Sequence, residues 1–224
     1  MLQSNEDLQK AVLNAIKWQP LLHAAEIGVT AKDGVITLTG IVDVYSKKIQ
    51  AENAAKNVIG VKAIAQEIEV KFGNSMSMKT DTEIANEVMN AWKWNWEIPH
   101  DKLKVTVEGG WVTLDGEAEW NYEKQAAKKS VEKLMGVIGV SNNISIRSIS
   151  EDAVEKTAVE DALAMNWALN DKNIEVNVSD HKVALSGTVG SIYQKEEAGR
   201  IAWAAPGIWA LENNLTVEYE YAFA

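Results

Sequence analysis

The stretch KDGVITLTG, residues 32–40, returns twice along the chain in altered form. Its counterparts are EGGWVTLDG at residues 108–116 and SDHKVALSG at residues 179–187. Each stretch has a two-residue turn, then alternating apolar and polar residues that end near a glycine. This pattern is typical of a hairpin turn leading into a half-buried strand. The sequence therefore predicts one structural unit in three copies.

Other positions repeat with the same spacing, which supports three copies in tandem. Gly40, Gly116 and Gly187 share one column, and Gly60, Gly136 and Gly207 share another with the same two offsets. We expect the units to span residues 1–72, 79–147 and 151–218. The join after the first copy, KFGNSMSMK at residues 71–79, has the composition of a flexible linker.

Each copy opens with the pattern of an amphipathic helix. Leu8, Val12 and Ile16 recur four residues apart, which places them on one face. The same columns hold Ile84, Val88 and Trp92 in the second copy and Val159 and Leu163 in the third. Asn5 and Asp81 stand where these helices should begin, so we expect them to be N-caps.

Two strands joined by a tight turn should follow. Asp33-Gly34 and Gly109-Gly110 suit a type I′ turn, whose two central residues need positive φ. His181 occupies this column in the third copy and tolerates that conformation less well. We expect the Gly40 column to let the second helix approach the sheet closely; a contact with a ligand is the alternative.

The second helix carries small residues on its inner face, which also permits close packing. These are Ala51 and Ala55, Ala127 and Val131, and Ala198 and Ala202. The helix should end at the Gly60 column, in the left-handed conformation, and a last strand follows. The predicted fold class is α/β, a two-layer α+β sandwich. It has three tandem α-β-β-α-β units, each with a small mixed sheet covered by two helices on one face.

At this point the pattern resembles a known family. DGVITLTG, the helix segment AENAAKNV and the strand segment GVKAIAQEIEV are similar to the BON domain, and GVSNNISI and PGIWALENNLTV continue the same frame in the other copies. The resemblance covers essentially the whole chain, and the sequence is most similar to triple-BON proteins without an export signal. It implies a bacterial osmotic-stress or envelope-stress protein that binds or scaffolds, without catalytic machinery. Binding to phospholipid is often suggested for this family.

No motif in the sequence indicates catalysis or a bound cofactor. The chain has no cysteine, and its three histidines, His23, His100 and His181, share no repeat column. Neither a zinc-type histidine spacing, a P-loop, GxGxxG nor GxSxG is present. We therefore predict no enzyme activity, no metal site and no cofactor. A formal net charge of −10 also disfavours nucleic acid as a partner.

Tryptophan is the unusual feature, with nine in 224 residues. Trp18 and Trp94 share one column near the end of the first helix, and Trp96 and Trp167 share another. Trp92 continues the helix stripe and should be core. Trp94 and Trp96 cannot both join that stripe, so at least one should be exposed or lie between units. The two interpretations are packing, and docking onto lipid headgroups or a protein partner.

Charge limits which copies would approach an anionic membrane. Residues 151–224 hold five Lys or Arg and thirteen Asp or Glu, so the third unit should be repelled. The second helices of the other two units carry candidate basic residues, which otherwise are ordinary solvated side chains: Lys47, Lys48, Lys124 and Lys128.

The predicted function is a non-enzymatic binding or scaffold protein that contacts a phospholipid surface or a protein partner. The alternatives are a cytosolic sensor of potassium or osmotic state and a purely structural, oligomerising module. The N-terminus shows no export signal and no window spans a membrane, so we expect a cytoplasmic protein. A periplasmic protein whose signal was removed is the alternative.

Overall fold

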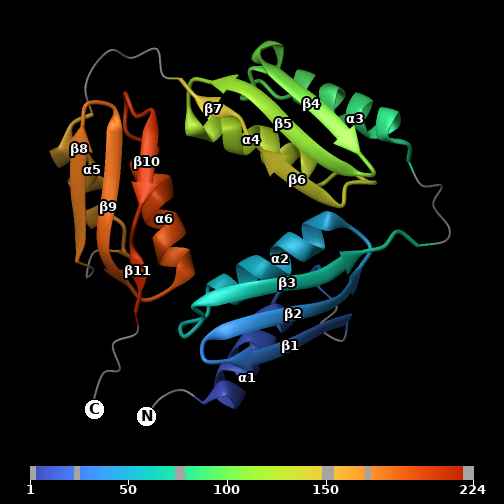
Figure 1. The fold of residues 1–224 in the computed structure, drawn as a ribbon, viewed down its shortest axis with the longest axis horizontal. Helices are drawn as coiled ribbons and strands as arrows, with labels where there is room; N and C mark the ends of the chain where they lie inside the picture. Colours follow the sequence, from blue (N-terminus) through green and yellow to red (C-terminus); the bar gives the residue numbers. More distant parts are fainter. Residues whose placement is uncertain (1–3, 23–25, 74–78, 148–153, 170–172, 219–224) are drawn as a thin grey trace. The chain divides into compact units, whose positions relative to one another are not determined.

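The structure is a computed structural model that describes residues 4–22, 26–73, 79–147, 154–169 and 173–218. Most of the expected linker, residues 74–78, lies outside the described residues. The described residues form three units with the same order of elements (Figure 1). The first unit consists of α1 (Asn5–Lys17), β1 (Ile27–Lys32), β2 (Val35–Val42), α2 (Tyr45–Lys56) and β3 (Ala63–Val70).

The second and third units repeat this order with a divided last strand. The second has α3 (Asp81–Lys93), the short 3₁₀ helix η2 (His100–Lys102), β4 (Leu103–Glu108), β5 (Trp111–Ala118), α4 (Asn121–Val131), β6 (Gly139–Asn142) and β7 (Ser145–Ile146). The third has α5 (Lys156–Ala164), β8 (Ile174–Ser179), β9 (Lys182–Val189), α6 (Ile192–Ala202), β10 (Ala210–Asn213) and β11 (Thr216–Val217).

The hairpin's second strand is the centre of each sheet. β5 pairs antiparallel with β4 and parallel with β6 and β7. β9 pairs in the same way with β8, β10 and β11. The first sheet has the corresponding order β1-β2-β3. The predicted small mixed sheet is confirmed, and its two edges are the first and last strands of each unit.

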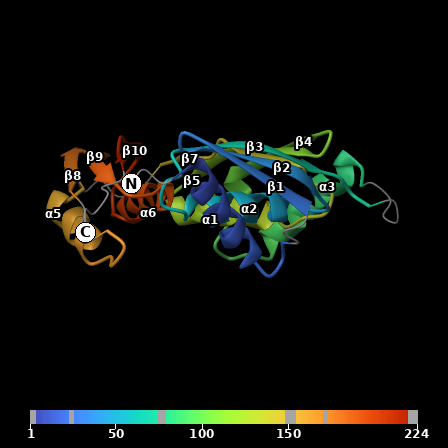
Figure 2. The same cartoon turned by 90° about the horizontal axis from the view of Figure 1, so that it is seen from below.

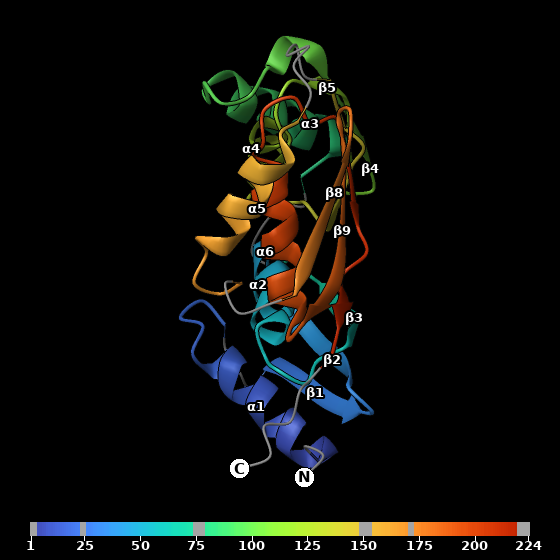
Figure 3. The same cartoon turned by 90° about the vertical axis from the view of Figure 1, so that its left-hand side faces the viewer.

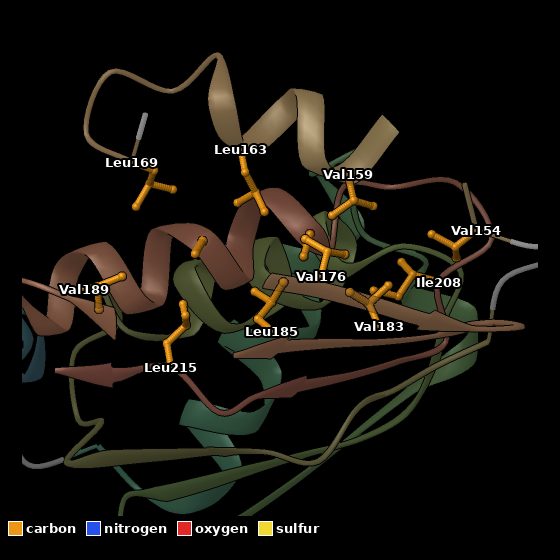
Figure 4. Close-up of a cluster of buried hydrophobic side chains, with 12 residues drawn as sticks. Val154, Val159, Leu163, Leu169, Val176, Val183, Leu185, Val189, Ile208 and Leu215 are labelled. Atoms are coloured by element: carbon orange, nitrogen blue, oxygen red, sulfur yellow. The ribbon is translucent and has the colours of Figure 1, made fainter. Parts of the chain in front are cut away.

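Both helices of a unit cover the same face of its sheet. Figure 2 shows α1 and α2 on one side of β1, β2 and β3, and Figure 3 shows α5 and α6 on one side of β8 and β9. The core lies between these two layers. In the third unit, Val159 and Leu163 point from α5 toward Val176 and Leu185 of the sheet (Figure 4). The predicted apolar stripes of α1, α3 and α5 are all buried.

The predicted N-caps were wrong by one residue. The side chains of Ser4 and Thr80 cap α1 and α3 by accepting from Asp7 N and Glu83 N. Asp81 instead binds the hairpin turn, where its carboxylate accepts from Gly109 N at 2.8 Å and Gly110 N at 2.9 Å. The carboxamide of Asn5 does the same for Asp33 N at 2.9 Å. These side chains fasten the start of the first helix to the tight turn.

The prediction that the Gly40 column lets the second helix approach the sheet was also wrong. A Cβ at Gly40, Gly116 or Gly187 would lie 2.0–2.3 Å from the backbone carbonyl oxygen just before the first strand of the unit, and φ is positive at all three. The strand, and not the second helix, therefore demands glycine here.

The second helices end earlier than predicted. α2, α4 and α6 stop at Lys56, Val131 and Ala202, and the Gly60 column follows in a separate turn, still with positive φ. The turn column behaves as expected in the first two units, where both central residues have positive φ. In the third unit only Asp180 does, and the His181 ring stacks on Trp209 at 3.8 Å between centroids.

An amide side chain, which the sequence patterns did not reveal, joins the second helix to the last strand. Asn142 Nδ2 donates to Lys124 O at 3.0 Å while its Oδ1 accepts from Ile144 N at 3.3 Å. Asn213 makes the matching pair of bonds to Lys195 O and Leu215 N. The same column holds Gln66, which reaches Lys48 O at 3.4 Å. All three units thus have an amide side chain bridging the second helix to this strand segment, although β3 continues through Gln66 while β6 and β10 end at their asparagines.

Candidate docking surface at the ends of the first helices

Each first helix ends in a short turn that carries exposed apolar side chains. We call residues 18–22, 94–98 and 165–169 the end turns. The C-cap residues are Trp18, Trp94 and Met165, which occupy one repeat column and are 84–88% exposed. A C-cap residue lies half outside the helix, so its side chain leaves the buried stripe.

The end turns share a fixed backbone geometry. In the second unit, Asn95 N donates to Trp92 O at 3.0 Å and Ile98 N donates to Asn95 O at 3.1 Å. The other two units have both bonds at the matching positions. A buried residue then anchors each turn in the core: Leu22, Ile98 and Leu169. Figure 4 shows Leu169 pointing into the core beneath α5. The exposed side chains therefore stand on an ordered support.

The second exposed column lies between the cap and the anchor. Trp96 and Trp167 are 88% and 84% exposed. Their turns are closed by an asparagine whose Oδ1 accepts from the residue two positions later, Asn95 from Glu97 N and Asn166 from Ala168 N. This local bond is typical of asparagine in turns. It holds each tryptophan at the apex.

The prediction for the tryptophan cluster is confirmed in its structural part. Trp92 is buried, and Trp94 and Trp96 are both exposed. Packing into the unit's own core is therefore wrong for Trp18, Trp94, Trp96 and Trp167. The structure brings Trp94 and Trp96 together on one turn, and it places Trp18 and Trp167 on the equivalent turns of the other two units.

Other surface tryptophans already make contacts within their own units. Trp111 is half-exposed, and its Nε1 donates to Ser141 Oγ at 2.9 Å. Trp209 is half-exposed and stacked on His181 with an interplanar angle of 7°. The end-turn indoles show no such contact among the described residues. A surface indole without a partner is a better candidate for binding than one that already packs.

The predicted lysines are less available than the tryptophans. Lys48 Nζ donates to Ile68 O at 2.7 Å, and Lys128 Nζ lies 3.5 Å from Glu132 Oε1. Partial burial lowers the pKa of Lys124. Lys47 is half-buried and also makes interactions. All four side chains are half-buried, so none of them is a fully exposed surface charge.

Two basic residues that the sequence patterns did not single out lie closer to the end turns. Lys17 and Lys93 are exposed in the last turns of α1 and α3, directly before Trp18 and Trp94. α5 has no basic residue in its last turn. The repeat alignment contained this signal, because Lys17 and Lys93 share a column in which the third unit has Ala164.

Tyr122 is another exposed aromatic side chain that the sequence patterns did not single out. It is exposed at the start of α4, and partial burial together with the carboxylates of Glu123, Glu97 and Glu119 raises its pKa. Glu97 belongs to the end turn, so its carboxylate is one of the charges that act on Tyr122. In the third unit, Gln194 Nε2 donates to Ala168 O at 2.8 Å, which ties the end turn to α6.

Within the described ranges, no cluster of three His, Asp or Glu side chains is arranged to hold a metal ion. In that same part of the chain, no helix is long and apolar enough to cross a membrane.

Comparison with known proteins identifies the repeated unit. The BON domain family model matches residues 4–71, 80–148 and 151–219. The chain belongs to the BON domain family. A curated relative is the osmotically-inducible protein Y of Escherichia coli (strain K12), 29% identical over 153 residues, which cover 65% of this chain and 75% of that protein.

Two solved structures of CdsD, a structural protein of the type III secretion system of Chlamydia trachomatis, also align. One is its C-terminal domain, at 14% identity and a TM-score of 0.25, covering 96% of this chain and 100% of that one. The other has 14% identity and a TM-score of 0.24, covering 95% and 92%. At these scores the alignments support nothing about this chain, and the BON assignment rests on the family match.

Proposed function

We propose that this chain is a non-enzymatic binding protein of the osmotic- or envelope-stress type that docks on a phospholipid surface through its end turns. The observation that supports this most strongly is the repeated exposure of tryptophan on an ordered turn. Four indoles, Trp18, Trp94, Trp96 and Trp167, are 84–88% exposed. Exposed indole is uncommon on a soluble surface, whereas tryptophan is enriched at membrane–water interfaces.

The stress type of the proposal has a separate support. BON domains cover almost the entire chain, and one relative is named for osmotic induction. Members of this kind bind or scaffold, which agrees with the absence of a catalytic motif in the sequence. The proposal is therefore of contact and not of turnover.

The charges favour the first two units for an anionic surface. Lys17 and Lys93 adjoin the exposed cap tryptophans, so an indole and a cation can reach the interface together. Each Lys near an anionic leaflet contributes about 1 kcal/mol. The third unit has no basic residue at its end turn and carries thirteen acidic residues against five basic ones in residues 151–224. Repulsion should keep it from an anionic surface.

Co-sedimentation with vesicles tests the proposal. The chain should pellet with vesicles of mixed phosphatidylglycerol and phosphatidylcholine, and the double variant Trp94→Ser, Trp96→Ser should bind at least about tenfold more weakly, since each buried indole contributes well over 1 kcal/mol. Ile59→Ser is the matched control, because Ile59 is also an exposed apolar side chain but lies outside the end turns.

The other outcomes count against the lipid. If the chain does not pellet with vesicles of any composition, phospholipid is not the ligand, and a protein partner for the end turns becomes the better explanation. If Ile59→Ser weakens binding as much as the end-turn variant, the contact is apolar but unspecific, and the end turns are not the docking surface.

A further inference from the structure

The three units differ in how the outer edge of their first strand is protected. In a two-residue hairpin the residues that flank the turn are hydrogen-bonded to each other, and the bonding alternates from there. In β4 this directs the backbone groups of Lys104, Thr106 and Glu108 toward β5. The N–H and C=O groups of Val105 and Val107 must therefore point outward, away from the sheet.

The first unit covers this edge with a side chain. Gln9 on α1 lies over β1, and its Nε2 donates to the outward carbonyl of Val29 at 2.7 Å. Val29 holds the column of Val105. The bond also confirms that this column faces outward. The Gln9 side chain at this carbonyl also stands in the way of a visiting strand.

The third unit places charges at the same positions. Lys156 stands in the column of Gln9, Glu160 stands one helical turn later, and the two form an ion pair at 3.4 Å. Charged side chains next to an edge strand discourage another strand from pairing with it, because pairing would remove them from water.

The second unit has neither protection. Its residues in these two columns are Ala85, which has no polar group to offer, and Met89, which is 59% exposed. Among the described residues, no side chain or strand bonds the outward groups of Val105 and Val107. Both valines are also only half-buried. β4 therefore combines an open backbone edge with an apolar strip along α3.

The sequence of β4 favours a second copy of itself as the occupant. Two antiparallel β4 strands, related by a two-fold axis at Thr106, pair Val105 of each copy with Val107 of the other. The same register sets Lys104 directly opposite Glu108 of the other copy, twice. The side chains of Lys104, Thr106 and Glu108 are exposed on the face of the sheet that the helices do not cover. Opposite charges in directly opposed cross-strand positions are favourable. In the same columns, β1 has Gly28 and Lys32 and β8 has Glu175 and Ser179, which offer no such match.

We propose that the chain self-associates through the outer edge of β4, as a two-fold dimer in which the two middle units share one continuous sheet. The contact provides four backbone hydrogen bonds between Val105 and Val107, two Lys104–Glu108 pairs and an apolar contact between the Met89 side chains. This does not depend on lipid binding, and an end-turn variant should leave it unchanged.

Sedimentation velocity without lipid, from about 5 to about 500 µM, covers the range in which a small edge interface should associate. We expect a monomer–dimer equilibrium. Lys104→Glu would set a glutamate opposite Glu108 of the other copy at both symmetry-related positions, and Glu108→Lys would likewise set a lysine opposite Lys104. Each single variant should therefore weaken the dimer at least about tenfold, because like charges in directly opposed positions are unfavourable. The double variant Lys104→Glu, Glu108→Lys restores opposite charges and should restore the dimer. Lys32→Glu, the matched edge residue of the first unit, is the control.

Two results would overturn the proposal. One is a monomer at every concentration. The other is a dimer that the single charge reversals do not weaken, or that the double reversal does not rescue, since the contact would then lie elsewhere. All of the changed residues are exposed, and circular dichroism of each variant checks that its fold is intact.

Discussion

The indole Nε1 of Trp92 donates a hydrogen bond to the backbone carbonyl of Ala127 at 3.3 Å, inside the core of the second unit. This bond joins α3 to α4. Trp92 also differs from its neighbours in burial, since Trp92 is 2% exposed whereas Trp94 and Trp96 are both 88% exposed. Of these three tryptophans within five residues, the first is thus part of the core and the other two are on the surface.

Truncating the buried tryptophan should be costly. Trp92→Ala leaves a large cavity and removes the bond to Ala127, so the second unit should lose about 3–5 kcal/mol of unfolding free energy. Trp94→Ala should change it by less than about 0.5 kcal/mol, because an exposed side chain contributes little. Urea titration followed by far-ultraviolet circular dichroism compares the two. Equal losses would mean that Trp94 is also packed.

The Gly40 column gives a backbone prediction. At Gly116 φ is +124°, and a Cβ would lie 2.3 Å from Lys102 O. Gly116→Ala should therefore destabilise the second unit by more than about 2 kcal/mol, from strain and steric overlap. Gly73→Ala is the control, since a Cβ at Gly73 has no neighbour within 4 Å. Thermal unfolding of the two variants measures the difference, and a tolerated Gly116→Ala would show that the strand can move aside.

The bridging asparagines should contribute through two bonds each. Asn213→Ala removes the bonds to Lys195 O and Leu215 N at 2.7 and 3.4 Å. We expect a loss of about 1–3 kcal/mol, because the helix carbonyl and the strand N–H are partly buried and lose their partner. Amide hydrogen exchange locates the effect. Faster exchange should be confined to α6, β10 and β11, and uniform acceleration over all three units would argue against a local joint.

The stability of the third unit should decrease at acidic pH. Bonds from Arg200 and Asn166 lower the pKa of Glu197 below its ordinary value, with the Arg200 bond the main cause. The folded state therefore favours the carboxylate. This stability is present above the pKa of an unfolded glutamate, about 4.3, and is lost as pH falls through the lower folded value.

Glu197→Gln tests that sign. The variant should be less stable than the wild-type chain at neutral pH, and the difference should shrink as pH falls below about 4. Chemical denaturation at several pH values gives the comparison. A difference that stays constant with pH would show that the charge of Glu197 is not responsible.

The repeat and the fold were predictable from the sequence because each rests on local patterns. The spacing of Leu8, Val12 and Ile16 identified a helix, and Asp33-Gly34 identified a hairpin turn, since periodicity and turn chemistry act over a few residues. The same argument predicted that at least one of Trp94 and Trp96 would be exposed or lie between units, because the stripe had no room for both. The structure then showed that both are exposed.

What the sequence did not reveal depends on contacts between distant elements. Asp81 sits at a helix start, where a cap is expected, yet its partners are Gly109 and Gly110 in the turn. Asn142 reads as an ordinary strand residue, yet it spans 18 positions to bond Lys124 O. The open edge of β4 became visible only when α3 was known to lie over it. Such pairings are set by packing and not by local pattern.

The central claim is that the end-turn tryptophans enter a phospholipid interface, and the most direct measurement is their own emission during a vesicle titration. We predict a blue shift with anionic vesicles, because the indoles leave water and Lys17 and Lys93 assist. The shift should be smaller at high salt, smaller with zwitterionic vesicles, and smaller in the Trp94→Ser, Trp96→Ser variant, which keeps only Trp18 among the end-turn indoles of the first two units. An unchanged spectrum at saturating lipid, together with no co-sedimentation, would contradict the claim.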